Sequence, residues 1–243
     1  MISKNQVKLI HSLELKKNRR REGLFVAEGP KVVGDILKAG FHARMLFSTT
    51  SSFDAELITE EELRRISFLQ HPQETLAVFE IPDTTSCQPP FVTNQLSLAI
   101  DGIQDPGNLG TIIRIADWFG IPTIYCSLDT VDVYNPKVVQ ATMGSLAHVQ
   151  VVYTDLLAFF QSLPPSYPVY GTLLDGENIY KQSLSQDGII VMGNEGNGIS
   201  PEVRKYITKR LLIPDFHTND LRAESLNVAI ATAITCSEFR RRI

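Results

Sequence analysis

Six short apolar runs, each ended by a polar, glycine-bearing or proline-bearing turn, constrain the fold of the second part of this chain. They cover residues 96–100, 121–126, 149–152, 169–173, 188–192 and 211–213. None of these runs alternates strictly with polar residues, which is the pattern of strands that are buried on both faces. Helical stretches separate most of them, so the sequence predicts a parallel sheet covered on both sides by helices.

The first part of the chain predicts a smaller α/β unit. Helix starts are expected at Ser3, at Pro30 and at Thr59, where Glu62 completes a capping-box spacing. Short apolar runs at residues 24–27, 43–47 and 75–79 predict strands between them. Residues 83–95 are rich in Pro, Thr and Ser and have no periodicity, which favours a linker. The predicted organisation is therefore a domain at 1–82, a linker at 83–95 and a second domain at 96–243.

The composition indicates where the protein acts and argues against a metalloprotein or a membrane protein. Hydrophobic residues make up 43% of the chain, which is enough for a sizeable core. The three cysteines and five histidines have no metal-ligand spacing, so no metal is expected. No apolar run approaches the ~20 residues of a membrane span, and no signal-peptide core is present at the N-terminus. A cytoplasmic protein with no membrane partner is expected.

Positive charge gathers at the start of the chain. Residues 1–44 hold ten Lys and Arg against four Asp and Glu, a net +6, while the remainder holds 13 against 23, a net −10. The densest stretch predicts contacts with RNA phosphates through Lys16, Lys17, Arg19, Arg20 and Arg21. The alternative is an ordinary solvated surface.

Three polar segments follow predicted strands of the second domain, where ligands bind in open parallel sheets. The first, DPGNLGTIIRIA, has Asn108 in an expected glycine turn and Arg114 in an otherwise apolar helix. Arg114 must either face a functional site or form an ion pair, and Asp117 is the candidate partner for the second alternative. The second, GNEGNGIS, places Glu195 among glycines. It is neither a dinucleotide fingerprint nor a P-loop, which disfavours a nucleotide-dependent dehydrogenase.

The third segment joins the last strand to the last helix. Ile213 and Pro214 end the strand, a polar loop covers residues 215–224, and Ser225 is expected to cap a helix that starts near Val228. Asn227 lies in the same first turn, where free backbone N–H groups favour polar ligands. The helix body is apolar on almost every side, which predicts close packing.

In this order, the three segments resemble the signature motifs of the SpoU/TrmH family of RNA 2′-O-ribose methyltransferases. Asn108 to Gly110 with Arg114 matches motif one, Gly193 to Gly196 matches motif two, and Ile213-Pro214 with Ser225 to Val228 matches motif three. The resemblance covers residues 96–243. The N-terminal domain is similar, more loosely, to the family's small ribosomal-protein-like substrate-binding domain.

The resemblance implies a trefoil-knotted α/β domain that binds S-adenosylmethionine. It assigns the cofactor mainly to backbone groups at Thr172, Leu173, Gly193, Ile213 and Leu226. It also implies a homodimer in which Asn108 and Arg114 of one subunit complete the active site of the other.

The same resemblance implies transfer of a methyl group to a ribose 2′-hydroxyl of structured RNA, with ribosomal RNA favoured over transfer RNA. The resemblance makes Arg114 the candidate general base. Free arginine is effectively always protonated, so the alternative role is a clamp for the RNA phosphate and the developing oxyanion. The remaining candidate catalytic residues, which orient the nucleotide and Arg114, are Asn108, Glu195, Ser225 and Asn227.

Some features depart from the family pattern or leave alternatives open. The loop at 215–224 is long and charged, and its Arg222 and His217 are candidate RNA contacts or plain surface residues. Trp118 and Phe119 are expected in core or dimer packing. The competing functions are a non-catalytic RNA-binding or ribosome-assembly protein with the same fold, and a knotted methyltransferase that modifies a base.

Overall fold

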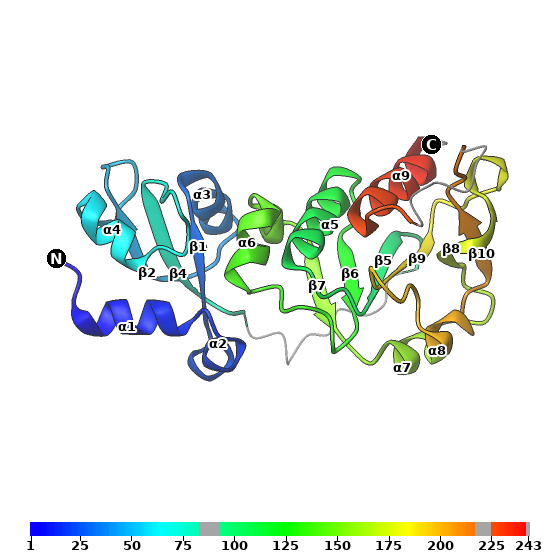
Figure 1. The fold of residues 1–243 in the computed structure, drawn as a ribbon, viewed down its shortest axis with the longest axis horizontal. Helices are drawn as coiled ribbons and strands as arrows, with labels where there is room; N and C mark the ends of the chain where they lie inside the picture. The colour runs from blue at the N-terminus through cyan, green and yellow to red at the C-terminus, as the bar shows by residue number, and fades with distance from the viewer. Residues whose placement is uncertain (83–92, 217–224, 242–243) are drawn as a thin grey trace. The chain divides into compact units, whose positions relative to one another are not determined.

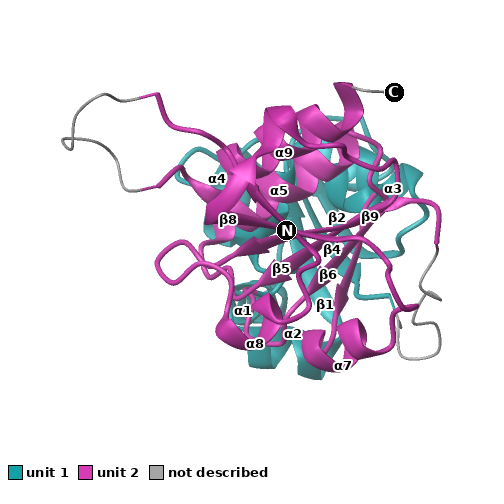
Figure 2. Cartoon of the chain, turned by 90° about the vertical axis from the view of Figure 1, so that its right-hand side faces the viewer, with its two compact units in different colours: residues 1–87, 132–148 teal, residues 88–131, 149–243 magenta. Residues whose placement is uncertain are grey.

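The computed structural model describes residues 1–82, 93–216 and 225–241. The chain forms two compact units (Figure 2). Unit 1 comprises residues 1–87 and 132–148, and unit 2 comprises residues 88–131 and 149–243. The predicted linker falls largely on residues 83–92, outside the described residues, so the domain boundaries stay a prediction.

Unit 1 is built on a four-stranded sheet with the strand order β1-β4-β2-β3. β4 runs antiparallel to both β1 and β2, and the short β3 runs parallel to β2. The strands are β1 (Leu24–Glu28), β2 (Ala43–Ser48), β3 (Glu56–Leu57) and β4 (Thr75–Glu80), and the helices are α1 (Lys4–Ser12), α2 (Lys16–Glu22), α3 (Pro30–Lys38) and α4 (Glu60–Ile66).

The N-terminal helices of unit 1 begin as the sequence predicts. Ser3 and Gln6 form a capping box at α1, and Thr59 and Glu62 form another at α4. The basic run forms a helix of its own, α2, after a break at residues 13–15. Side chains of α1 and α4 pack with one face of the sheet in a core that includes Ile10, Leu63 and Val78.

The segment 132–148 packs with the N-terminal strands and helices, although the sequence places it within the second domain. It carries α6 (Pro136–Thr142) and the short helix η1 (Ser145–Ala147). Its first residue, Asp132, accepts hydrogen bonds from Nε and Nη2 of Arg19. The Tyr134 ring lies 4.7 Å from the Phe25 ring, and burial raises the pKa of Tyr134 to about 12. The chain therefore leaves unit 2 after residue 131, contributes this segment to unit 1, and returns to unit 2 at residue 149.

Unit 2 is built on a six-stranded sheet whose pairings are all parallel, as predicted. The strand order is β10-β8-β9-β5-β6-β7. The strands are β5 (Leu96–Asp101), β6 (Thr123–Cys126), β7 (Gln150–Tyr153), β8 (Val169–Asn178), β9 (Gly188–Gly193) and β10 (Lys209–Leu212). The chain switches direction across the sheet between β5 and β9, the place where open α/β sheets bind ligands.

Helices cover both faces of this sheet. Figure 1 shows α5 (Pro106–Trp118) and α9 (Val228–Arg241) on one face, and α7 (Leu156–Gln161) and α8 (Pro201–Arg204) on the other. Ile189 and Val191 of β9 pack in the core that α7 and α8 cover. The alternate residues Ile190 and Met192 therefore face α5 and α9. The short helix η2 (Ile179–Lys181) follows β8. No helix among the described residues is long and apolar enough to cross a membrane.

Candidate active site

The three polar segments gather at the carboxyl ends of the parallel strands. Asp101, at the end of β5, pairs with Gly193, at the end of β9. The residues that follow both strands therefore start side by side. The sequence predicted that each motif follows a strand, and the sheet order adds that these two strands are neighbours.

Motif one differs from its predicted conformation. The glycine turn was expected to include Gly107 and Gly110, but both lie in α5, which begins at Pro106. The turn is instead Gly102 to Asp105, and Gly102 has a φ of 74° that favours glycine. Asp105 caps α5, because its Oδ1 accepts a hydrogen bond of 2.8 Å from the backbone N–H of Asn108.

Motif two is a turn fixed by the asparagine that precedes Glu195. The Nδ2 of Asn194 donates to the carbonyl of Gly102 at 2.7 Å, and its Oδ1 accepts from the backbone N–H groups of Gly196 and Asn197. A Cβ on Gly193 would collide with the backbone of Gly198 and Ile199, so this position requires glycine. The turn leaves the Glu195 side chain exposed and directed at motif one.

Motif three caps the last helix with a different residue from the one predicted. Ser225 is exposed and makes no hydrogen bond to any described residue. The cap is Asn227, whose Oδ1 accepts from the backbone N–H groups of Ala229 and Ile230. Asn227 is the better placed residue because it directly precedes α9, whereas Ser225 lies three residues before it.

One chain of hydrogen bonds joins all three motifs. The Nδ2 of Asn108 donates to Oε1 of Glu195 at 2.8 Å, and the Oδ1 of Asn108 accepts from Nδ2 of Asn227 at 2.9 Å. A carboxylate only accepts, so it sets the orientation of the Asn108 amide, which in turn sets that of Asn227. These three candidate catalytic residues therefore form one oriented polar cluster, within a single chain.

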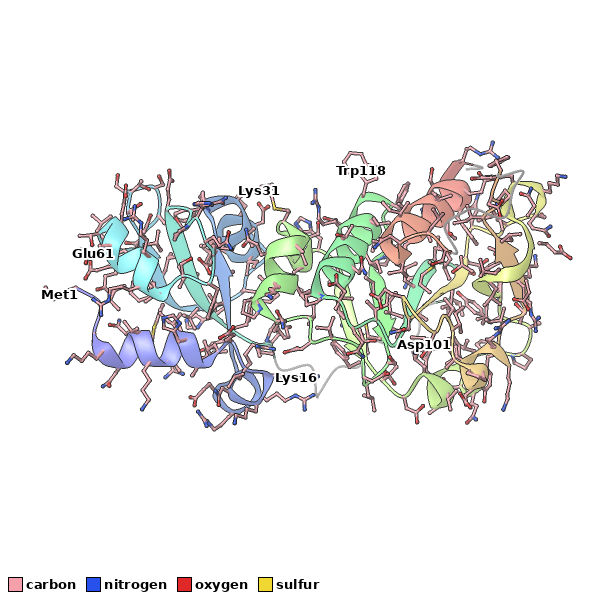
Figure 3. All side chains as sticks on the ribbon, in the orientation of Figure 1. Met1, Lys16, Lys31, Glu61, Asp101 and Trp118 are labelled. Atoms are coloured by element: carbon pink, nitrogen blue, oxygen red, sulfur yellow. The ribbon has the colours of Figure 1, made fainter. Side chains whose placement is uncertain are left out.

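Arg114 lies apart from this cluster. It is six positions after Asn108 on α5, about 240° around the helix axis, so the two side chains leave from different faces. The guanidinium is exposed and makes no hydrogen bond or ion pair with any described residue, so the alternative pairing with Asp117 is not observed. Trp118, one turn further on, is 86% exposed and points away from α5 (Figure 3).

The residues predicted to hold the cofactor lie near one edge of the sheet. Thr172 and Leu173 follow the paired part of β8, Gly193 ends β9, and Ile213 follows β10. These strands are neighbours in the order β10-β8-β9. Leu226 directly precedes the capping residue of α9 and is half exposed. Backbone groups at adjacent strand ends suit a ligand recognised through the main chain, as S-adenosylmethionine was expected to be.

The predicted RNA contacts on α2 divide into two kinds. Lys17, Arg20 and Arg21 are exposed, and Lys16 is half-buried. Arg19 is 1% exposed, so its assignment as an RNA contact is wrong. Its guanidinium donates to Asp132 and to the carbonyls of Leu13 and Glu14.

Two further exposed lysines of unit 1 were not selected from the sequence. Lys4 and Lys8 lie four positions apart on α1 and therefore share a face. The four-residue spacing can be read from the sequence, but the charge run at residues 16–21 is the denser signal for RNA binding. Arg222 and His217 lie outside the described residues. Among the residues that the structure describes, no three His, Cys, Asp or Glu side chains form a group suited to a metal ion.

Comparisons with known proteins identify relatives of both parts of the chain. Residues 95–237 match the SpoU rRNA Methylase family, and residues 4–77 match the MRM3-like substrate binding domain. The 23S rRNA (guanosine(2553)-2′-O)-methyltransferase RlmP of Bacillus subtilis is 31% identical over 98% of this chain and 97% of its own length.

Solved structures agree over the whole chain. A putative RNA methyltransferase of the TrmH family from Porphyromonas gingivalis is 46% identical, with a TM-score of 0.85 and full coverage of both chains. The AdoMet-bound rRNA methyltransferase from Sinorhizobium meliloti is 30% identical, with a TM-score of 0.85 over 100% of this chain and 97% of its own.

These matches confirm the predicted fold class, a knotted parallel-sheet α/β domain preceded by a small substrate-binding domain, and the predicted cofactor. The chain belongs to the SpoU rRNA methylase family, the S-adenosylmethionine-dependent RNA 2′-O-ribose methyltransferases.

Proposed function

We propose that this enzyme methylates ribosomal RNA, at the 2′-hydroxyl of one ribose. The observation that carries the proposal is the hydrogen-bonded cluster of Asn108, Glu195 and Asn227, which joins three motifs at the carboxyl ends of the strands. Ribosomal RNA is favoured because the relatives from Bacillus subtilis and Sinorhizobium meliloti are both named rRNA methyltransferases. A protein that only binds RNA would not need this cluster.

The proposed chemistry is a direct displacement. S-adenosylmethionine supplies a methyl group that is already activated by a positively charged sulfur. The ribose 2′-oxygen bonds to the methyl carbon, the carbon–sulfur bond breaks, and the hydroxyl proton leaves to solvent. The chain's own part is to position the nucleotide and to stabilise the charge that develops on oxygen.

Each candidate catalytic residue has a proposed role in that positioning. The cluster of Asn108, Glu195 and Asn227 presents a fixed set of amide and carboxylate groups to the nucleotide. Ser225, two residues before Asn227, offers a hydroxyl that no described residue binds. Arg114 is proposed as the clamp for the RNA phosphate and the developing oxyanion rather than as a base, because a guanidinium keeps its proton in proteins.

A homodimer with a shared active site is proposed from the surface of α5 and α9. Arg114 is exposed and has no polar partner among the described residues, and large apolar side chains are exposed on both helices, Trp118 of α5 at 86% and Ile230 of α9 at 52%. Large apolar side chains exposed in this way are typical of protein interfaces. A second subunit covering them would receive Arg114 into its own site, next to its bound cofactor. Asn108, by contrast, is bonded to Glu195 and Asn227 of its own chain.

Complementation between two inactive variants tests the shared site. Arg114→Ala leaves the cofactor segments intact, and Gly193→Ala disrupts the motif-two turn. After the two proteins are mixed and their subunits are exchanged, a shared site returns activity up to about a quarter of the wild-type level, by random pairing. A site contained in one chain gives no recovery.

The RNA is proposed to dock through the exposed cations of α2, namely Lys17, Arg20 and Arg21, with the half-buried Lys16 at their edge. The remaining proposals rest on the sequence: the protein acts in the cytoplasm, and the reaction uses no metal ion.

The reaction itself is tested with labelled S-adenosylmethionine and RNA from cells that lack this enzyme. After nucleoside digestion, label in one 2′-O-methylnucleoside of ribosomal RNA is the expected result. Label in a base would support the base-modifying alternative. Cofactor binding without label in ribosomal RNA, transfer RNA or assembly intermediates would favour the non-catalytic alternative.

A further inference from the structure

Strand β8 leaves the sheet for five residues and then returns to it. Arg210 of β10 pairs with Gly171, but the next residue, Leu211, pairs with Glu177. Residues 172–176 therefore have no partner on β10, and the pairing of β8 with β9 ends at Gly171. This excursion begins with Thr172 and Leu173, two of the residues proposed to hold the cofactor.

The first part of the excursion is attached to β9. The Oγ1 of Thr172 donates to the carbonyl of Val191 at 3.2 Å and lies 3.2 Å from the sulfur of Met192. Leu173 packs on the apolar core of unit 2. Because Gly193 follows Met192 directly, these contacts fix the start of the excursion beside motif two.

The second part is attached by one carboxylate to two other elements. The Nη2 of Arg204 donates to both oxygens of Asp175, at 2.8 and 2.9 Å, and the Nη1 of Arg210 donates at 3.1 Å. Arg204 ends α8, which follows the motif-two turn, and Arg210 lies on β10, three residues before Ile213. Asp175 thus links the excursion to α8, which follows the motif-two turn, and to β10, which leads to Ile213.

The backbone leaves little freedom at the same place. A Cβ on Gly176 would lie 2.6 Å from the carbonyl carbon of Leu211, so the excursion returns in direct contact with β10. The Asp175 ion pairs are about half exposed, and exposed pairs contribute little to the stability of a fold. Their main effect is therefore to hold the conformation of residues 172–176.

We propose that Asp175 is a positioning residue for S-adenosylmethionine, which holds residues 172–176 in the binding conformation through Arg204 and Arg210. The inference rests on the proposed assignment of Thr172 and Leu173 to the cofactor. A loop that is already ordered before binding loses less conformational freedom when the ligand arrives. The effect should therefore appear in cofactor affinity rather than in the rate at saturation.

The test is Asp175→Asn, which keeps the size of the side chain and removes its charge. Calorimetric titration of the full-length protein with S-adenosylmethionine should give a Kd raised about tenfold. The kcat at saturating cofactor should stay within about twofold, since Asp175 makes no proposed contact with the reacting atoms. Glu60→Gln is the matched control, because it removes the exposed Glu60–Arg64 pair of unit 1 and should leave the Kd unchanged.

Salt separates positioning from a general structural effect. Raising ionic strength screens exposed ion pairs, so it should weaken cofactor binding by the wild type more than by Asp175→Asn. Arg204→Gln keeps the Arg210 contact and should give a smaller rise in Kd. It supplies the answer if Asp175→Asn does not fold.

An unchanged Kd in a folded Asp175→Asn or Arg204→Gln protein overturns the proposal, as does equal salt dependence in variant and wild type. The titration needs no RNA, so failure of the proposed rRNA reaction does not affect this test. Loss of affinity on Thr172→Val in the same assay checks the assignment of the excursion to the cofactor separately.

Discussion

Helices α2 and α5 each carry an arginine for which the sequence predicts a contact with RNA, but one of the two side chains is buried and the other is exposed. Arg19 of α2 is buried and donates to one carboxylate and two carbonyls. Arg114 of α5 is exposed and has no partner among the described residues. Neighbours distant in sequence decide the difference, because Asp132 lies 113 residues from Arg19. Only an arginine whose donors are unengaged is available to a phosphate or an oxyanion.

The largest expected effect is on catalysis. Arg114→Ala should lower methyl transfer about a hundred- to a thousandfold, the size of effect seen when one oxyanion-stabilising group is removed. Cofactor affinity and thermal stability should not change, since the guanidinium makes no hydrogen bond or ion pair with any residue that the structure describes. Arg114→Lys keeps the charge but loses the planar fork, and should recover only a small part of the activity. Full activity in Arg114→Ala would place Arg114 with the ordinary surface residues.

Arg19 should show the reverse behaviour. Arg19→Ala leaves Asp132 without its partner in a nearly buried site, which should cost about 3 kcal/mol of unfolding free energy. Urea unfolding measures the change, and Arg20→Ala is the neighbouring control, expected within about 0.5 kcal/mol of wild type. If both variants lose equal stability, the contrast between buried and exposed arginines on α2 is wrong.

The exposed cations of α2 should affect binding and leave stability alone. The double variant Lys17→Ala with Arg20→Ala should weaken RNA binding and lower the slope of log K against log salt by about one to two. Filter binding across a salt series gives the slope. Arg64→Ala, on α4 in an ion pair with Glu60, is the control and should keep the wild-type slope. An unaltered slope in the double variant would remove α2 from the RNA interface.

The smallest effect concerns Glu28, a buried carboxyl group of unit 1. Burial raises its pKa, although Ser67 and the backbone N–H of Phe68 donate to it. A raised folded-state pKa means that its stabilising contribution is present at acidic pH and is lost as pH rises through that pKa. In Glu28→Gln, the amide oxygen can accept from the Phe68 N–H and the amide nitrogen can donate to the Ser67 hydroxyl. The variant does not ionise, so its melting temperature should rise relative to that of the wild type as pH increases from 4 to 8. A parallel pair of melting curves would show that Glu28 is not titrating in this range.

Much of the fold followed from the sequence because its signals are local. The six apolar runs became the six parallel strands, and the capping boxes at Ser3 and Thr59 formed as expected. The start of α5 was misplaced because Gly107 and Gly110 suggested a turn, whereas Asp105 and Pro106 are equally good signals for a helix start. The cap of α9 was misassigned for a similar reason, since serine and asparagine both favour the N-cap position and only the structure shows that Asn227 occupies it.

The residues of the candidate active site could be predicted from the sequence, but the hydrogen bonds between them could not. Order along the chain placed Asn108, Glu195 and Asn227 at strand ends, but only the sheet order brings β5 beside β9 and their side chains within hydrogen-bond distance. Burial of Arg19 and the association of residues 132–148 with unit 1 depend on contacts of high sequence separation, for which a single sequence carries no local signal.

The association of Asp132 with Arg19 also sets an order of events during synthesis. When the first 87 residues leave the ribosome, Arg19 has no carboxylate partner, because Asp132 has yet to be made. The N-terminal part can complete its packing only after the first strands of the methyltransferase sheet have been translated. The two parts of the enzyme therefore mature together, and a fragment of residues 1–87 should fold incompletely on its own.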